Sequence, residues 1–318
     1  MEFISAIVRV FLLVALAIPG FILQKLKKLP ESFSGGLTTL ILYVTLPVLT
    51  VTTFVKTPYE PQLLMKMSVV LLLSAILLPL AFIISKLAFS KWKDDAAKGA
   101  LVSSGYLNNC AFMGIPVLQV FFPDSNEPVI YAVVFGVIFN IITWTLLVYT
   151  LTGKKEFMSI KRAFLNPPSL VLLIALPLFF LKVSLPSMVL GALDTIGGLT
   201  TPLSLIILGI RLAEIKPKEI FTSGRVYLSA FIKLIVVPAV TLAIMLGVER
   251  IFPIGSLTVV SMFMIMGMPT ASSVIMFSEM FGGDSHESAK CILFTALLSI
   301  LTIPLMALIG DNIIAAGL

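Results

Sequence analysis

The chain has 318 residues, of which 58% are hydrophobic and only 12% are charged, and its mean hydropathy is +1.10. Soluble domains carry about 25% charged residues, so the composition excludes a soluble protein and indicates an integral membrane protein. The formal net charge is +6, and the basic excess lies between the apolar segments. This placement indicates membrane orientation rather than a nucleic-acid partner.

A hydropathy window of about 19 residues predicts an all-α protein with ten transmembrane helices. Lengths of about 17–25 residues suit a bilayer, and the N-terminal segment lacks a cleavage site typical of a signal peptide. The predicted spans are roughly 3–23, 35–55, 64–88, 97–121, 128–151, 167–183, 188–212, 219–247, 255–280 and 288–309.

The loop charges predict the orientation of these spans. Ten spans place both termini on one side, and sixteen of the twenty-two basic residues lie on the opposite face. The positive-inside rule assigns that face to the cytoplasm. We therefore expect a multi-pass protein of the cell membrane with both termini outside.

Two of the spans contain a helix break near their centre. The fourth includes Asn108 to Pro116, and the ninth includes Met266-Gly267-Met268-Pro269, which repeats Met113-Gly114-Ile115-Pro116. Proline removes a backbone donor and clashes with the preceding turn, and glycine adds backbone freedom. Two such breaks in corresponding positions are typical of a transporter's binding site.

The sequence also predicts two related halves, 1–151 and 167–318, joined by a basic, amphipathic cytoplasmic linker over 152–166. The motif Asp124 to Glu127 after the fourth span matches Asp284 to Glu287 after the ninth. Offsets of 153 to 160 residues between matching positions indicate an internal repeat. Because each half has five spans, the second half is inserted upside down, which predicts inverted five-helix repeats.

The breaks define the candidate binding residues. A helix that restarts at the membrane centre presents free backbone donors and the positive end of its dipole, which suits an anion or a carboxylate. The polar residues beside both breaks fall toward the cytoplasm, which predicts a vestibule open to that side. The predicted substrate-binding residues are Asn108, Asn109, Gly114, Pro116, Lys233, Gly267, Pro269, Thr270, Ser272, Ser273 and Asn140.

Several of these residues also have structural interpretations. Asn109 could form helix–helix hydrogen bonds, and Ser or Thr beside a proline could satisfy backbone groups. Lys233 is the one basic residue deep within a span, where a charge is costly and indicates function by default; it could instead extend to an interface. Asn140 could line a cavity or pack. The sequence contains no His-Glu-x-x-His or Gly-x-Ser-x-Gly motif, so we expect neither an enzyme nor a metal or cofactor site.

The residues from Asn109 to Pro116, together with Asn166-Pro167-Pro168, Met268-Pro269 and Thr295 to Pro304, resemble the auxin efflux carrier family, with its plant, bacterial and archaeal members. The resemblance covers essentially the whole chain. It implies a scaffold of spans 1, 2, 6 and 7 and a mobile unit of spans 3–5 and 8–10. It also implies an organic-anion substrate, an elevator motion and a homodimer. The chain departs from the plant members in having no charge between Ser68 and Ile84 and only a short central loop.

These observations favour a secondary carrier that exports a small organic anion, either a carboxylate or an auxin-like molecule. Two alternatives stay open: a sodium-coupled symporter for organic anions, and a sensor that binds a solute without transporting it. No carboxylate lies beside either break, which argues against a strong sodium site.

Overall fold

The computed structural model describes residues 8, 11–12, 15–30, 32–214 and 223–317. Nine of the 21 residues of the predicted first span lie outside the described residues, and its described end forms the start of α2. All regular elements in the described ranges are helices, in agreement with the all-α prediction. Their bounds are α2 Ile18–Lys25, α3 Phe33–Leu40, η1 Ile41–Thr45, α4 Leu46–Lys56, α5 Pro61–Ala88, α6 Asp95–Tyr106, η2 Cys110–Gly114, α7 Ile115–Phe121, α8 Glu127–Ile142, η3 Thr143–Leu147, α9 Val148–Thr152, η4 Lys155–Phe157, α10 Ile160–Phe164, α11 Pro167–Phe180, α12 Ser187–Gly198, α13 Thr200–Glu214, α15 Gly224–Phe231, η5 Ile232–Val236, α16 Val237–Ile251, α17 Ser256–Met266, α18 Ser273–Phe281 and α19 Ser285–Ala315.

Several of these helices join end to end into segments long and apolar enough to cross a membrane. The described part of the chain contains seven of them: 33–56, 61–88, 127–152, 155–180, 187–214, 224–251 and 285–315. Shorter apolar helices cover 110–121 and 256–266, where the sequence predicted the two interrupted spans. The protein is therefore a multi-pass membrane protein.

Prolines explain three widened helical turns. The π-helical turns η1, η2 and η5 end two residues before Pro47, Pro116 and Pro238, respectively. A proline has no N–H and its ring clashes with the carbonyl four residues earlier, and a π turn is one way for a helix to accommodate this. The amide N–H of Gly114 accordingly donates to the carbonyl of Asn109, five residues back, at 2.9 Å.

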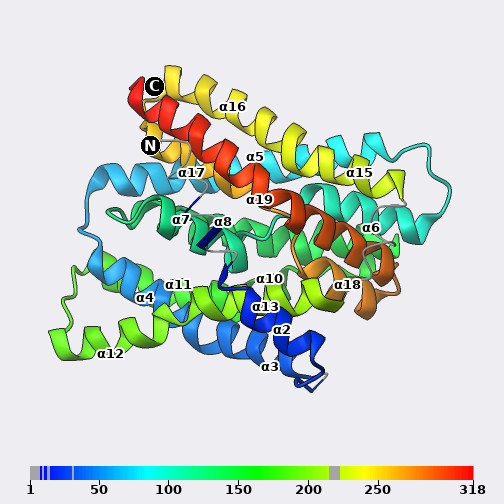
Figure 1. Cartoon of the computed structure of the whole chain (residues 1–318). Coiled ribbons are helices and arrows are strands. Elements are labelled where there is room, and N and C mark those ends of the chain that lie inside the picture. Colours follow the sequence, from blue (N-terminus) through cyan, green and yellow to red (C-terminus); the bar gives the residue numbers. More distant parts are fainter. Residues whose placement is uncertain (1–7, 9–10, 13–14, 31, 215–222, 318) are drawn as a thin grey trace.

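The helices form two groups, with α8 between them (Figure 1). One group contains α2, α3, α4, α11, α12 and α13, in which α13 packs on α2, and α4 packs on α11 and α12. The other contains α5, α6 and α15 to α19, in which α17 packs on α16 and α19. Each group contains helices from both halves of the chain.

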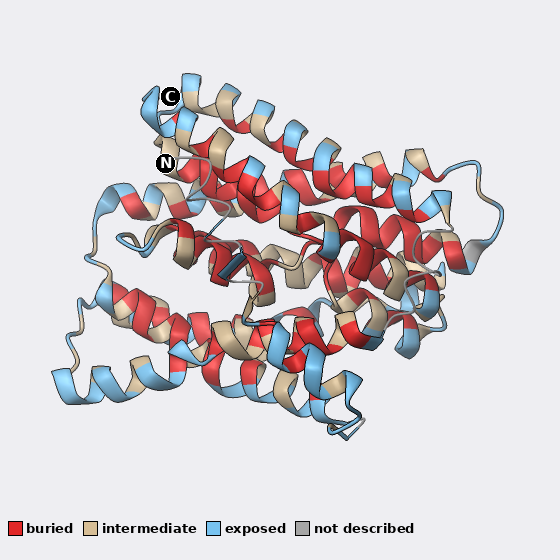
Figure 2. Cartoon of the chain, viewed as in Figure 1, coloured by how far each residue is buried: buried red, intermediate tan, exposed pale blue. Residues whose placement is uncertain are grey.

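Burial is greatest where the second group surrounds α17, whose residues 258–266 are all buried (Figure 2). In the first group, α2 and α13 approach closely through glycines. A Cβ atom on Gly209 would lie 1.8 Å from the carbonyl oxygen of Ala17, and one on Gly20 would lie 2.2 Å from that of Ile206. Small residues allow such close helix packing within a membrane.

The predicted linker contains two short helices, η4 and α10. Arg162 lies over the ring of Trp144, 5.3 Å from its centroid, and the Ser159 amide donates to the Trp144 carbonyl at 3.0 Å. Asn166 then caps α11, because its Oδ1 accepts from the Ser169 amide at 3.0 Å. These contacts attach the linker to the segment that precedes it and to α11, which follows it.

The crossing of two broken helices

Both predicted breaks are present. The first separates α6, which ends at Tyr106, from η2, which begins at Cys110; Leu107 between them is extended, with φ −80° and ψ 131°. The second separates α17, which ends at Met266, from α18, which begins at Ser273. Each of these two segments therefore enters the centre of the protein as one helix and leaves it as another.

The two breaks contact each other through their backbones. Asn108 and Thr270 form an antiparallel bridge. On either side of it, the Asn109 amide donates to the Pro269 carbonyl at 2.8 Å, and the Ala271 amide donates to the Leu107 carbonyl at 3.2 Å. This pairing satisfies backbone groups that have left their helices, as the interior of a membrane protein requires. We refer to residues 107–110 and 266–272 as the crossing.

Two carbonyls at the end of α17 lack their regular helical donors, which would be the amides four residues ahead. The Ile265 carbonyl would bond to the amide of residue 269, but Pro269 has none. The Met266 carbonyl would bond to the Thr270 amide, which donates instead to Thr295 Oγ1 at 3.1 Å. The Ile265 oxygen accepts from the Met268 amide at 3.3 Å and lies 2.6 Å from Asn108 Nδ2. The Met266 oxygen lies 3.1 Å from Lys233 Nζ.

The adjacent asparagines have different surroundings. Asn108 is fully buried, and its Oδ1 has no hydrogen-bond partner among the described residues. Asn109 is partly exposed, and its Oδ1 caps η2 by accepting from the Phe112 amide at 3.2 Å. The Asn109 side-chain NH₂ has no partner in the described part of the chain. Asn109 can therefore donate to a solute, whereas Asn108 Nδ2 is already engaged in the crossing.

The hydroxyl residues also divide into two kinds. Thr270 Oγ1 donates to the Ser104 carbonyl at 2.7 Å, where α6 ends, and its side chain is buried. Ser272 and Ser273 are partly exposed at the start of α18. Although the residue is partly exposed, the Oγ atom of Ser273 is itself buried and has no hydrogen-bond partner within the described ranges. Thr295 was not among the predicted binding residues. It lies on α19, and its contact with Thr270 arises from tertiary packing, which the sequence does not show.

The glycines beside the breaks permit close packing. A Cβ atom on Gly114 would lie 3.4 Å from the side chain of Met268, so the two breaks are nearly in contact there. A Cβ atom on Gly267 would lie 2.1 Å from the terminal carbon of Met306 and 3.3 Å from the ring of Pro238. Gly267 therefore lets the end of α17 pack closely against α16 and α19, and neither glycine presents a side chain to a solute.

Asn140 lies at a different junction. Its Nδ2 is 3.2 Å from Asn166 Oδ1 and 3.4 Å from Ser169 Oγ, so it joins α8 to the start of α11. No hydrogen bond joins it to the crossing. Its predicted contact with a solute stays a prediction.

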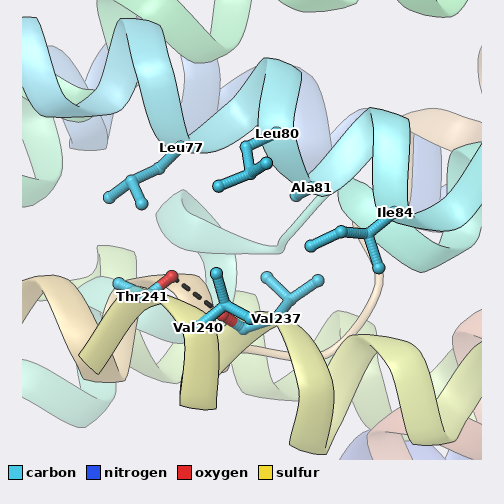
Figure 3. A pocket seen from close by; sticks show the side chains of 7 residues that line it. All are labelled: Leu77, Leu80, Ala81, Ile84, Val237, Val240 and Thr241. Atoms are coloured by element: carbon cyan, nitrogen blue, oxygen red, sulfur yellow. Dashed lines mark hydrogen bonds between the residues drawn. The ribbon is translucent and has the colours of Figure 1, made fainter. Parts of the chain in front are cut away.

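A small hollow lies apart from the crossing, between α5 and α16 (Figure 3). Its empty volume is about 160 Å³, including open space, and its lining is apolar except for one hydroxyl. That hydroxyl, on Thr241, donates to the carbonyl of Val237 in its own helix at 2.9 Å. The hollow offers no charged group for an anion.

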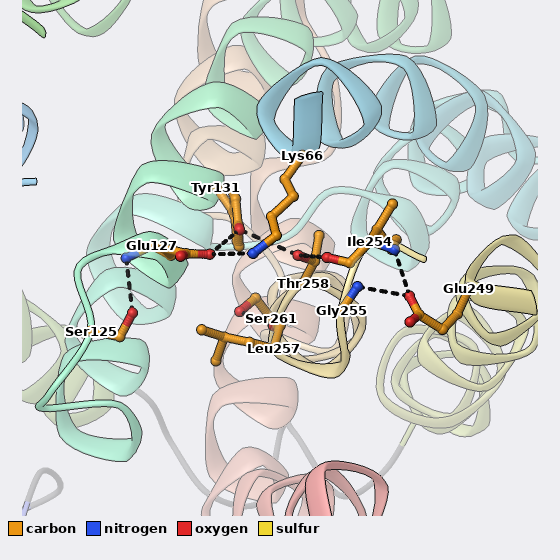
Figure 4. Close-up of polar contacts among 10 residues, drawn as sticks. All are labelled: Lys66, Ser125, Glu127, Tyr131, Glu249, Ile254, Gly255, Leu257, Thr258 and Ser261. Atoms are coloured by element: carbon orange, nitrogen blue, oxygen red, sulfur yellow. Dashed lines mark hydrogen bonds and ion pairs between the residues drawn. The ribbon is translucent and has the colours of Figure 1, made fainter. Parts of the chain in front are cut away.

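A polar cluster that the sequence analysis did not identify joins the ends of α5, α8 and α17 (Figure 4). Lys66 Nζ lies 3.3 Å from Glu127 Oε2, which also accepts from the Tyr131 hydroxyl at 2.5 Å. Thr258 Oγ1 lies 3.3 Å from the Tyr131 oxygen. Nearby, Glu249 Oε2 accepts from two successive backbone amides that precede α17. The cluster fixes the α17 end remote from the crossing.

The comparison with known families identifies the family to which this protein belongs. The chain matches the model of a family described as membrane transport protein over residues 3–159 and 154–307. The chain belongs to this family. It is the auxin efflux carrier family that the motifs around the breaks resemble, so the sequence-based identification is confirmed.

A relative agrees with this membership. Over 305 residues, the chain is 26% identical to an uncharacterized transporter of the archaeon Methanocaldococcus jannaschii. The match covers 93% of this chain and 96% of that protein. Family membership and the apolar helices together make this protein a membrane transporter.

Proposed function

We propose that this transporter is a secondary carrier that moves a small organic anion, a carboxylate or an auxin-like molecule, out of the cell. The observation that carries the proposal is the crossing itself. Two helices restart there, η2 beside Asn109 and α18 beside Ser272, and each presents the positive end of a helix dipole. Helix N-termini are favourable sites for carboxylates and other anions.

The charges around the crossing favour an anion over a neutral solute. Each half-helix end carries a partial charge of about half a unit, and the two positive ends are offset by the two negative ends of α6 and α17. The ammonium of Lys233, bonded to the Met266 carbonyl, adds a whole positive charge. Within the described part of the chain, no carboxylate lies within ion-pair distance of Lys233, so the region has an excess of positive charge.

The carrier function implies a particular arrangement in the membrane. We propose ten spans in two inverted repeats, 1–151 and 167–318, with both termini outside and the linker 152–166 in the cytoplasm. The partly exposed Asn109, Ser272 and Ser273 would then form a vestibule on the cytoplasmic side. A negative-inside potential would favour exit of an anion by about 2.3 kcal/mol per charge per 100 mV.

The two helix groups suit an elevator motion. The group with α2, α3, α4 and α11 to α13 would be the scaffold and would form a homodimer in the bilayer, and the other would move with the crossing. In this proposal α7 and α8 move with the second group. Their contacts to the scaffold include Thr201 Oγ1 donating to Gln119 on α7 at 2.9 Å and Asn140 on α8 donating to Asn166 at 3.2 Å. Both would break during the motion, so this structure would represent one of the transport states.

Counterflow in liposomes tests the carrier. Vesicles loaded with unlabelled benzoate, acetate, succinate or indole-3-acetate should accumulate the same labelled anion above protein-free controls, saturably and on reconstitution of this chain. Anion binding by the purified chain without counterflow would support the sensor alternative and refute the carrier. Uptake that requires external Na⁺, compared with N-methyl-D-glucamine, would support the sodium-coupled alternative.

The Asn109→Asp variant tests the site. Aspartate keeps the oxygen that caps η2 but removes the free NH₂ and adds a negative charge, so flux of the active anion should fall at least tenfold with the melting temperature nearly unchanged. Asn109→Ala, which also loses the cap, should lose both flux and some stability. Normal flux in Asn109→Asp would remove this residue from the site.

A further inference from the structure

The environment of Lys233 indicates a role distinct from contact with the solute. Its side chain is fully buried within the turn η5, and Nζ has one hydrogen-bond partner among the described residues, the carbonyl oxygen of Met266 at 3.1 Å. Met266 is the last residue of α17. The ammonium therefore lies at the negative end of a half-helix, on the buried side of the crossing.

A cation at this position answers a specific need. Pro269 and the diverted Thr270 amide leave the Met266 carbonyl without a backbone donor, and the end of α17 carries about half a negative charge. In transporters with broken helices, unwound carbonyls and half-helix C-termini coordinate Na⁺ or H⁺. The end of α17 has the features of such a cation site, with a lysine ammonium already within hydrogen-bond distance.

The first break is completed without a charge. At the end of α6 the Ser104 carbonyl accepts from the neutral hydroxyl of Thr270. If Pro79 and Pro238 correspond in the two halves, the position equivalent to Lys233 is Ser74, whose hydroxyl donates to Val70 in its own helix at 2.6 Å. A charged side chain thus bonds to the helix end at the second break, and a neutral one does so at the first.

We propose that Lys233 is a tethered cation, which neutralises the end of α17 and takes the place of a free monovalent cation in the crossing. The crossing is then complete without Na⁺, and the fixed charge stays with the protein while the anion is bound and released. Lys233 is a positioning residue. The inference rests on the proposed carrier only for its consequence that flux does not require Na⁺.

Chemical rescue of Lys233→Ala tests this role on the purified full chain. The substitution leaves a cavity that propylammonium fits, since this ion replaces the deleted carbons and the ammonium. In N-methyl-D-glucamine buffer the melting temperature of the variant should be lower than that of the wild type. Propylammonium should restore most of the loss in a saturable manner, whereas tetramethylammonium, which lacks N–H donors, should not.

Lys98→Ala is the matched control. Lys98 also donates to a backbone carbonyl, that of Ser90 at 3.3 Å, but its head group is exposed. Its substitution should leave the melting temperature nearly unchanged and insensitive to propylammonium. Equal responses of the two alanine variants and the wild type to propylammonium would overturn the proposal, as would a Lys233→Ala variant as stable as the wild type.

Two further variants test the proposal if Lys233→Ala does not fold. Lys233→Met fills the space without a charge or a donor, so its melting temperature should be lowered and should not recover with propylammonium. Lys233→Arg keeps a cation and should be more stable than the methionine variant. Wild-type stability in Lys233→Met would refute the tethered cation.

Flux measurements separate this inference from the carrier proposal. If the wild type shows saturable counterflow, its rate should be the same in Na⁺ and in N-methyl-D-glucamine, and Lys233→Ala should regain flux with propylammonium. If the wild type shows no counterflow but propylammonium restores the melting temperature of Lys233→Ala, the carrier is refuted and the tethered cation is retained. If the wild type shows counterflow but propylammonium does not restore the melting temperature of Lys233→Ala, the tethered cation is refuted and the carrier is retained.

Discussion

Replacing Thr270 with valine should test whether the contact between the breaks stabilises the protein. Valine has nearly the same shape, so the substitution removes the hydroxyl that donates to the Ser104 carbonyl at 2.7 Å and changes little else. The Thr270 amide keeps its own partner on Thr295. The perturbation is therefore confined to one hydrogen bond between the two broken helices.

The magnitude follows from what the Ser104 carbonyl loses. Its helical donor would be the Asn108 amide, but α6 ends at Tyr106, so the carbonyl has left the regular helical pattern. Leaving a buried acceptor without a partner costs about 1–3 kcal/mol. We therefore expect Thr270→Val to lower the free energy of unfolding by about this amount.

Thr241→Val provides a matched control. Thr241 and Thr270 are both 1% exposed, but Thr241 Oγ1 donates to Val237, four residues back in α16, where the helix can supply the regular donor. Its loss should change the free energy of unfolding by less than about 1 kcal/mol. The measurement is reversible unfolding by SDS in mixed micelles. Losses of equal size in the two variants would refute the reasoning.

Two other substitutions probe features outside the crossing. Gly209→Ala should weaken the packing of α2 on α13, because the new methyl group would lie 1.8 Å from the Ala17 carbonyl oxygen, whereas Gly191→Ala, with open space around it, should not lower the melting temperature. Glu127→Ala should lower the free energy of unfolding by about 1–3 kcal/mol, since it leaves the Lys66 ammonium and the buried Tyr131 hydroxyl without their acceptor. If a Lys66→Met, Glu127→Ala double variant loses the full sum of the two single losses, Lys66 and Glu127 are not a coupled pair.

Helix positions could be predicted because they depend on local composition. Apolar segments of suitable length and the prolines between them predicted most spans and both breaks. The predicted span 188–212 lies within the segment 187–214, although two helices, α12 and α13, form that segment and join at Leu199. Gly197 and Gly198 before this point were a signal that hydropathy alone does not use.

Partners of individual side chains could not be predicted, because they depend on tertiary placement. Asn108 and Asn109 are adjacent and chemically identical, yet one bonds to a carbonyl 157 residues away and the other caps its own segment. The sequence favoured Lys233 as a contact for a solute. Its acceptor is a backbone carbonyl, which no residue pattern identifies.

The position of Pro269 gives the crossing its two chemically distinct sides. Because proline lacks an N–H, the end of α17 needs donors from other segments, and Asn108 and Lys233 supply them on the fully buried side. With these donors engaged there, the residues left to meet a solute are the partly exposed Asn109 and the serines that open α18. In the proposed carrier, a positive charge held behind the site, with neutral donors in front of it, would attract an anion without forming an ion pair with it. An anion held in this way could still leave, which the proposed carrier would require at each end of its cycle.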